Sequence, residues 1–134
     1  MAKQNSTEKS ASWIIEKIDS TELFLIKLSG EFTDQNWLEL TRDLLLSRKS
    51  DELFVIMDCS NCIDDVGHTG FWQIMDEMEK SGVLRYRLAI ISVDEADEYR
   101  KNLALAISEN FKVQLEVMIF PELLSAINWF QTDS

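Results

Sequence analysis

Short apolar runs alternate with amphipathic segments along most of this chain, and this alternation constrains its fold more than any other feature. After two initial strands, predicted at 13–18 and 23–28, mainly apolar runs recur at 53–57, 88–93 and 115–120, and the run at 53–57 is continuous. Runs of this length and composition are typical of strands that are buried on both faces. Segments with apolar residues at helical spacing separate these runs, and one more follows the last run. The alternation therefore predicts an α/β fold with a mainly parallel sheet.

The expected order of elements is β-β-α-β-α-β-α-β-α. The polar turn at 19–22 joins the first two strands as an antiparallel hairpin, so we expect a single-layer, mostly parallel five-stranded sheet with an antiparallel edge strand and four helices. Thr33 is the predicted N-cap of the first helix. We expect residues 12–131 to form a single domain, preceded by a flexible tail over residues 1–11.

Each predicted helix should bury one apolar stripe. In the second helix we expect Met75 and Met78 to reach the core. The stripes of the last two helices are expected at Tyr99, Leu103, Ala106, Ile107 and Phe111, and at Leu123, Leu124, Ile127 and Phe130. Trp129 falls outside the last stripe, so we expect it to cover a sheet edge or to support a homodimer.

Charge and composition narrow the classes of function. The 134 residues carry a formal net charge of −11, with 46% hydrophobic and 28% charged residues, which is typical of a globular domain. An acidic surface repels nucleic acid and anionic lipid, so we expect neither as a partner. No apolar run approaches the roughly 20 residues of a membrane span, and the N-terminus does not resemble a secretory signal. We expect a cytoplasmic protein without stable membrane insertion.

Acidic residues gather where the parallel strands are predicted to end. The functional loops of such sheets lie beyond the carboxyl ends of the strands, so this edge is the predicted functional edge. We expect Asp58, at the end of its strand, to accept backbone N–H bonds. The acids of the edge are Glu31, Asp34, Asp58, Asp64, Asp65, Asp94, Glu95, Asp97 and Glu122.

The stretch MDCSNCIDDVGHTGFW, from Met57 to Trp72, contains both cysteines of the chain and its one histidine. Cys59, Cys62 and His68 are residue types that bind zinc. A structural zinc site, however, usually draws further ligands from a second Cys/His cluster, and the sequence has none. We therefore expect no metal at this site and keep these three residues as its weakest candidates.

The same three side chains offer a thiol nucleophile and a base. The neighbouring acids Asp64 and Asp65 disfavour the thiolate, which is the reactive form. No Gly-rich phosphate cradle, dinucleotide motif or hydrolytic motif is present either. We expect neither catalysis nor a cofactor, and a thiol or metal site is our third hypothesis.

Three stretches resemble the STAS and SpoIIAA-like superfamily, the fold of anti-sigma-factor antagonists and related regulatory domains. FLIKLSGEFT, at 24–33, resembles the strand that ends in a Ser/Asp-Gly turn before the first helix. FVIMDCSNCIDDVG, at 54–67, is similar to the central strand and its Asp-Ser-Ser-Gly loop. VMIFPELLSAINWF, at 117–130, resembles the closing strand and the Ala-x-x-Trp helix. The resemblance spans residues 12–131 and implies a SpoIIAA-like fold.

In the phosphoregulated members of this superfamily, a partner kinase phosphorylates a serine of the Asp-Ser-Ser-Gly loop, and the dephosphorylated form binds that partner. Aligning 64–67 with the loop places Asp65 at the serine, so the usual switch would be missing. A shifted alignment at 68–70 offers Thr69 as a candidate phosphoacceptor but shortens the following helix by about one turn. We prefer the first alignment, and the simpler interpretation of Thr69 is a helix N-cap.

The resemblance implies a non-enzymatic regulatory or protein-interaction module that binds a protein partner through the loop and helix at 64–79. The expected partner-binding residues are Asp64, Asp65, Gly67, His68, Thr69 and Trp72. A partly exposed Trp72 would make a good interface anchor. The alternative function is the binding of a small apolar ligand or a lipid between the helices and the sheet, which a cavity of roughly a few hundred Å³ would favour.

Overall fold

Five strands form one sheet in the order β1-β2-β3-β4-β5 in the computed structural model, which describes residues 10–18, 22–64 and 66–132. The first two strands pair antiparallel, and each later pair is parallel. The predicted order of elements and the antiparallel edge strand are therefore confirmed. The elements are β1 (Ser12–Lys17), β2 (Leu23–Phe32), α2 (Asp34–Ser47), β3 (Glu52–Asp64), α3 (His68–Lys80), β4 (Arg85–Ile91), α4 (Ala96–Ser108), β5 (Gln114–Phe120) and α5 (Leu123–Thr132).

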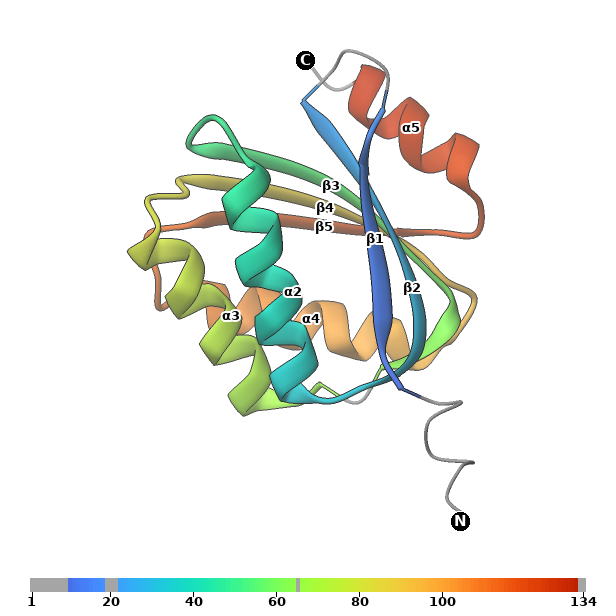
Figure 1. Ribbon diagram of the computed structural model, residues 1–134, viewed down its shortest axis with the longest axis horizontal. Coiled ribbons are helices and arrows are strands. Elements are labelled where there is room, and N and C mark those ends of the chain that lie inside the picture. The colour runs from blue at the N-terminus through green and yellow to red at the C-terminus, as the bar shows by residue number, and fades with distance from the viewer. Residues whose placement is uncertain (1–9, 19–21, 65, 133–134) are drawn as a thin grey trace.

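Helices cover both faces of the sheet, but unequally (Figure 1). The helices α2, α3 and α4 connect successive parallel strands and pack side by side on one face, whereas α5 contacts β3, β4 and β5 from the other. Neighbouring strands follow each other in sequence, and crossovers of one hand therefore place all three connecting helices on the same face. No helix in the described part of the chain is long and apolar enough to cross a membrane.

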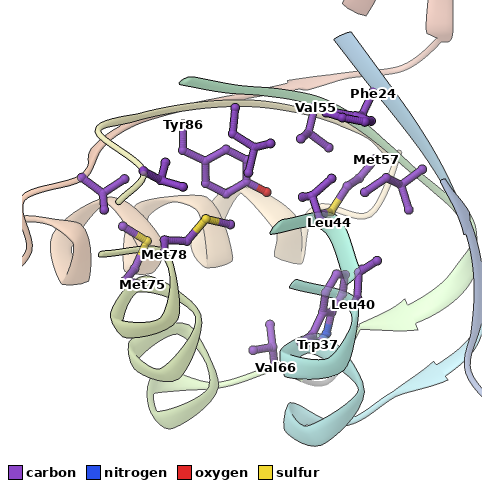
Figure 2. Close-up of a cluster of buried hydrophobic side chains, with 14 of the residues drawn as sticks. Phe24, Trp37, Leu40, Leu44, Val55, Met57, Val66, Met75, Met78 and Tyr86 are labelled. Carbon is purple, nitrogen blue, oxygen red and sulfur yellow. The ribbon is translucent and has the colours of Figure 1, made fainter. Parts of the chain in front are cut away.

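The larger of two core clusters lies between the sheet and the three connecting helices. Figure 2 shows Met75 and Met78 of α3 and Leu44 of α2 reaching toward Tyr86 of β4. Met75 and Met78 are 3% and 1% exposed, as the sequence predicts. The smaller cluster lies under α5 and includes Ala126, which is fully buried.

A capping box starts α2. The side-chain oxygen of Thr33 accepts a hydrogen bond from the Asn36 N–H at 3.3 Å, and Asn36 Oδ1 accepts one from the Thr33 N–H at 2.9 Å. Two of the N–H groups that a helix start leaves unpaired are satisfied in this way. Thr33 is therefore the N-cap, as predicted.

The predicted stripes of α4 and α5 are partly wrong. Tyr99 is 71% exposed and Leu124 is 62% exposed, although the spacing places both in the core. The buried faces instead include Ala104 on α4 and Ala126 on α5. A small side chain lets a helix backbone approach the sheet closely, and this contact, rather than the apolar periodicity alone, sets the rotation of each helix about its axis.

A buried cation joins α5 to the sheet. Arg87 of β4 is 3% exposed, and its guanidinium carbon lies 4.1 Å from the centroid of the Trp129 ring and 5.1 Å from that of Phe130. Its Nε donates a hydrogen bond of 2.6 Å to Glu116 Oε1 on β5. Trp129 also contacts Phe120, so it covers β4 and the edge strand β5, in line with one of its two expected roles.

The strands β2 and β3 continue beyond their predicted ends at residues 28 and 57. They stay paired in parallel as far as Phe32 and Asp64. The sequence from Asp58 onward is polar, so the pattern indicates a loop there. Backbone hydrogen bonds to β2 hold it as a strand, since these bonds do not depend on the side chains.

One extra residue bulges from β3 within this extension, between Asp58 and Asn61. In a regular strand, residues three apart point to opposite faces of the sheet. Cys59 and Cys62 are three apart, yet both pack against the larger core cluster. The bulge changes the register so that both cysteines reach the same face.

The helices α2 and α3 approach closely at Gly70, which is buried. A Cβ atom added there would overlap the carboxylate of Asp34 on α2 and would lie 2.5 Å from Cγ2 of Val66. At Gly67, one turn earlier, an added Cβ atom would meet nothing within 4 Å. The two glycines therefore offer a matched test of this contact.

We expect Gly70→Ala to lower the free energy of unfolding by about 1–3 kcal/mol, because the added methyl group overlaps the side chains of Asp34 and Val66, which must move. This is the net change: the cost of the overlap should outweigh the roughly 1 kcal/mol by which alanine favours a helix over glycine. Urea denaturation measures the change, with Gly67→Ser as the control that should leave stability unchanged or slightly raised. A Gly70→Ala variant as stable as the unmodified protein would contradict the close approach.

Candidate functional site at residues 64–79

The segment from residue 64 to residue 79 begins where β3 ends. Asp64 is the last residue of β3. Asp65 lies outside the described residues. Gly67 is the N-cap of α3, with φ −120°, and its carbonyl accepts a hydrogen bond of 3.0 Å from the Phe71 N–H. The predicted N-cap role of Thr69 is therefore wrong, because Thr69 is already the second residue of the helix.

His68 and Thr69 lie in the first turn of α3, and both are exposed. This turn carries the positive end of the helix dipole and N–H groups without partners in the helix. The helix runs from His68 to Lys80. Its start agrees with the first alignment of the loop, in which 64–67 precede the helix.

A row of three aromatic rings crosses the surface of α3. The Trp72 ring lies 6.1 Å from the His68 ring, nearly parallel to it, and 4.9 Å from the Phe111 ring at an angle of 66°. Trp72 is 40% exposed. The edge-to-face contact with Phe111 restricts the indole, so a large apolar side chain is presented to solvent in one defined position.

Phe111 reaches Trp72 because the segment after α4 is tied to α3. The backbone N–H of Lys112 donates a hydrogen bond of 2.7 Å to Glu79 Oε2. Farther along α3, Asp76 pairs with Lys80 at 2.8 Å, and the hydrogen bond and negative charge of Asp76 raise the pKa of Lys80. The exposed side of α3 thus combines aromatic rings with charged side chains, many of which are already paired.

This arrangement of sheet and helices has known counterparts. A crystal structure of an uncharacterised protein of the DUF3478 family from Shewanella loihica PV-4, described as having a SpoIIAA-like fold, is similar over 89% of this chain and 92% of that chain, with 18% sequence identity and a TM-score of 0.56. The fold is SpoIIAA-like. An anti-sigma factor antagonist from Mycobacterium paratuberculosis matches over 92% of this chain and 96% of that chain, with 12% identity and a TM-score of 0.46. No protein-family model and no curated protein matches the sequence.

Within the SpoIIAA-like fold, the two cysteines lie on β3 and the histidine on α3. Both cysteines are half-buried, and neither forms a disulfide bond within the described residues. In the described part of the chain, no three His, Cys, Asp or Glu side chains gather closely enough to hold a metal ion. Cys59, Cys62 and His68 lie within one sixteen-residue stretch of the sequence, but the end of β3 and the start of α3 separate the two cysteines from the histidine.

Asp58 holds the bulge of β3. Its Oδ1 accepts hydrogen bonds from the Ser60 N–H at 3.0 Å and from the Ser60 hydroxyl at 2.6 Å. The expectation that Asp58 accepts a backbone N–H bond is confirmed. The residue lies inside the extended β3 rather than at a strand end, and its contacts give it a structural role.

The carboxyl ends of β2 to β5 lie at one edge of the sheet, as the parallel pairing requires. Part of the predicted acidic edge is neutralised there. Arg100 of α4 pairs with Asp97 at 2.7 Å and with Asp94 at 3.5 Å. Asp97, which is 6% exposed, also accepts a hydrogen bond from the Ser92 hydroxyl. Both acids are therefore paired at the start of α4, with Asp97 buried and the Asp94 side chain 60% exposed.

A cavity of about 70 Å³ lies between the sheet and the three connecting helices. A buried water needs roughly 10–15 Å³ of such space, so the cavity has room for roughly five to seven water-sized groups. This volume is far below the few hundred Å³ at which a lipid ligand would be favoured. The lipid part of the alternative hypothesis therefore gains no support from the cavity.

The sequence pattern does not identify the roles of Phe111 at the surface of α3 and of Tyr86 in the cavity. The pattern predicts Phe111 only as a core residue, whereas Phe111 also supports Trp72. Tyr86 lines the cavity from β4. Its position in the alternating strand RYRLAII could have marked it as a polar group facing the helices.

We expect Asp58→Ala to lower the free energy of unfolding by about 1–3 kcal/mol, because two hydrogen bonds to a carboxylate are lost at once. Ser60→Ala should cost less, since the backbone N–H bond remains. Urea denaturation measures the difference. The control is Asn61→Ala, because Asn61 is an exposed neighbour whose substitution should change stability by no more than about 0.5 kcal/mol. Equal losses for Asp58→Ala and Asn61→Ala would show that the carboxylate does not hold the bulge.

Proposed function

We propose that this protein is a non-enzymatic regulatory module that binds a partner protein through the loop and helix at 64–79. The observation that carries the proposal is the exposed Trp72, held between His68 and Phe111. Tryptophan is the residue most enriched among side chains that dominate binding energy in protein interfaces. An anchor that is already held in position loses less conformational freedom on binding.

The surroundings of Trp72 support a protein surface rather than a catalytic site. His68 and Thr69 lie exposed beside it on the first turn of α3. Gln73 is exposed as well. These side chains form a polar rim around an apolar centre, which is the usual composition of a protein interface. Asp64, Asp65 and Gly67 lead into the same turn, so they complete the proposed partner-binding set.

Thr69, an exposed hydroxyl within this surface, is the candidate phosphoacceptor of the shifted alignment only, because the usual switch is missing in the preferred one. A phosphate adds about −1.5 to −2 charges and three strong acceptor oxygens. Placed beside Trp72, on the helical turn that follows Asp64 and Asp65 in the sequence, it would change both the charge and the hydration of the interface. Phosphorylation at this position would therefore control partner binding.

We expect Trp72→Ala to weaken capture of a specific partner from native cell lysate by at least about tenfold, which corresponds to about 1.4 kcal/mol. The matched control is Leu46→Ala on α2, because Leu46 is 86% exposed and lies outside 64–79. Quantitative mass spectrometry of the captured proteins, followed by calorimetry with the purified partner, measures the loss. Thermal unfolding of both variants checks that the fold persists without the Trp72–Phe111 contact.

A double variant, Asp64→Lys with Asp65→Lys, tests the loop separately from the indole. If this variant and Trp72→Ala lose the same partner while Leu46→Ala retains it, the surface at 64–79 is the binding site. If all three variants capture the same proteins as the unmodified chain, the proposal fails.

A further inference from the structure

The hydroxyl group of Tyr86 faces the cavity in the larger core and has no hydrogen-bond partner among the described residues. Tyr86 is 3% exposed, lines the cavity, and forms no hydrogen bond through its hydroxyl with any residue in the described part of the chain. Figure 2 shows its ring beneath the sheet, with the oxygen directed toward the side of Leu44 and Met57. A buried tyrosine usually finds a hydrogen-bond partner, since an unpaired hydroxyl in the interior is costly.

The hydroxyl of Tyr86 is a hydrogen-bond donor throughout the physiological pH range. Burial raises its pKa, and the nearby Cys59 raises it further, so the proton stays on the oxygen. A group that enters the cavity can therefore satisfy Tyr86 by offering an acceptor oxygen.

The remaining wall of the cavity is mainly apolar. Leu88 and Ile90 lie on the same face of β4 as Tyr86 and follow it toward the carboxyl end of the strand, over about 13 Å. Interior strands of parallel sheets are normally buried on both faces. Leu88 and Ile90 are only half-buried, and both line the cavity. Over the middle of β4, these side chains therefore face the cavity instead of packing against a helix.

The charged residues that line the cavity come from the start of α4, and each has a partner within the chain. Arg100 pairs with Asp97 at 2.7 Å, and Lys101 pairs with Glu98 at 2.7 Å. An ionic ligand would have to compete with these pairs. The wall therefore fits a neutral molecule better than a charged one.

We propose that this cavity binds a small, neutral, mainly apolar molecule that accepts a hydrogen bond from Tyr86. With a volume of about 70 Å³, it suits a ligand of roughly five to seven non-hydrogen atoms, such as a simple phenol, cyclic ketone or short alcohol. Trp72 does not line the cavity. This proposal is therefore independent of the proposed partner surface, and either can fail without the other.

Phenol and toluene are suitable probes, because they have nearly the same shape and differ in the hydroxyl group. In titrations followed by methyl NMR, we expect phenol to shift the signals of Met57, Leu88 and Ile90, which line the cavity. The methyl groups of Ile14 and Leu124, which are exposed elsewhere, should not move. Phenol should bind about three- to tenfold more tightly than toluene, as one hydrogen bond predicts.

Two pairs of proteins make the test specific. Tyr86→Phe removes only the hydroxyl, so phenol should bind this variant no better than toluene does. Ala104→Leu fills the cavity from α4 and should abolish binding of both probes, whereas Ala106→Leu, exposed on the same helix, should leave binding unchanged. Thermal unfolding confirms that each variant is folded. Tyr86→Phe should be at least as stable as the unmodified protein, because no described residue forms a hydrogen bond with the hydroxyl that is lost.

Two results would overturn the proposal. If neither probe shifts the cavity methyl groups at millimolar concentration, and water gives a nuclear Overhauser effect to Tyr86, the cavity holds water only. If phenol and toluene bind equally to the unmodified protein and to Tyr86→Phe, the hydroxyl does not recognise a ligand. Selective phenol binding that Tyr86→Phe and Ala104→Leu both remove would establish the site.

Discussion

The long parallel ladder between β2 and β3 is the interaction on which the rest of the structure depends. It extends to Phe32 and Asp64, so the two strands end side by side at the same edge of the sheet. The helix after each strand therefore starts at nearly the same place, and Gly70 of α3 packs against Asp34 at the start of α2. Because the ladder sets where α3 begins, it also sets where Trp72 and His68 reach the surface.

The same ladder accounts for the unusual segment that follows Met57. A strand with polar side chains is stable here because β2 supplies its backbone hydrogen bonds, and Asp58 holds the bulge that lets Cys59 and Cys62 share one face. Chemically reactive residue types thus serve in packing and in strand geometry. Among the described residues, their proximity in sequence brings no three His, Cys, Asp or Glu side chains close enough in space to hold a metal ion.

The two faces of the sheet are packed differently. Under α5, the guanidinium of Arg87 is stacked on Trp129, and its Nε donates a hydrogen bond to Glu116. Under the other three helices, apolar packing is incomplete and leaves the cavity beside Tyr86. Empty space in a core costs stability, since the lining atoms lose dispersion contacts. A filled cavity and a satisfied hydroxyl would recover part of that loss.

The sequence by itself determined the order of strands and helices, the parallel sheet with its antiparallel edge, the N-cap at Thr33 and the burial of Met75 and Met78. These features depend on hydrophobic periodicity and on contacts between residues close in the chain, and both can be recognised in the amino-acid sequence. Only the tertiary structure decided the extension and bulge of β3, the exposure of Tyr99 and Leu124, the support of Trp72 by Phe111 and the place of Tyr86 at the wall of the cavity. Each of these depends on how segments distant in sequence fit together, and that fit is set by side-chain volume and backbone pairing across the sheet, which no local pattern records.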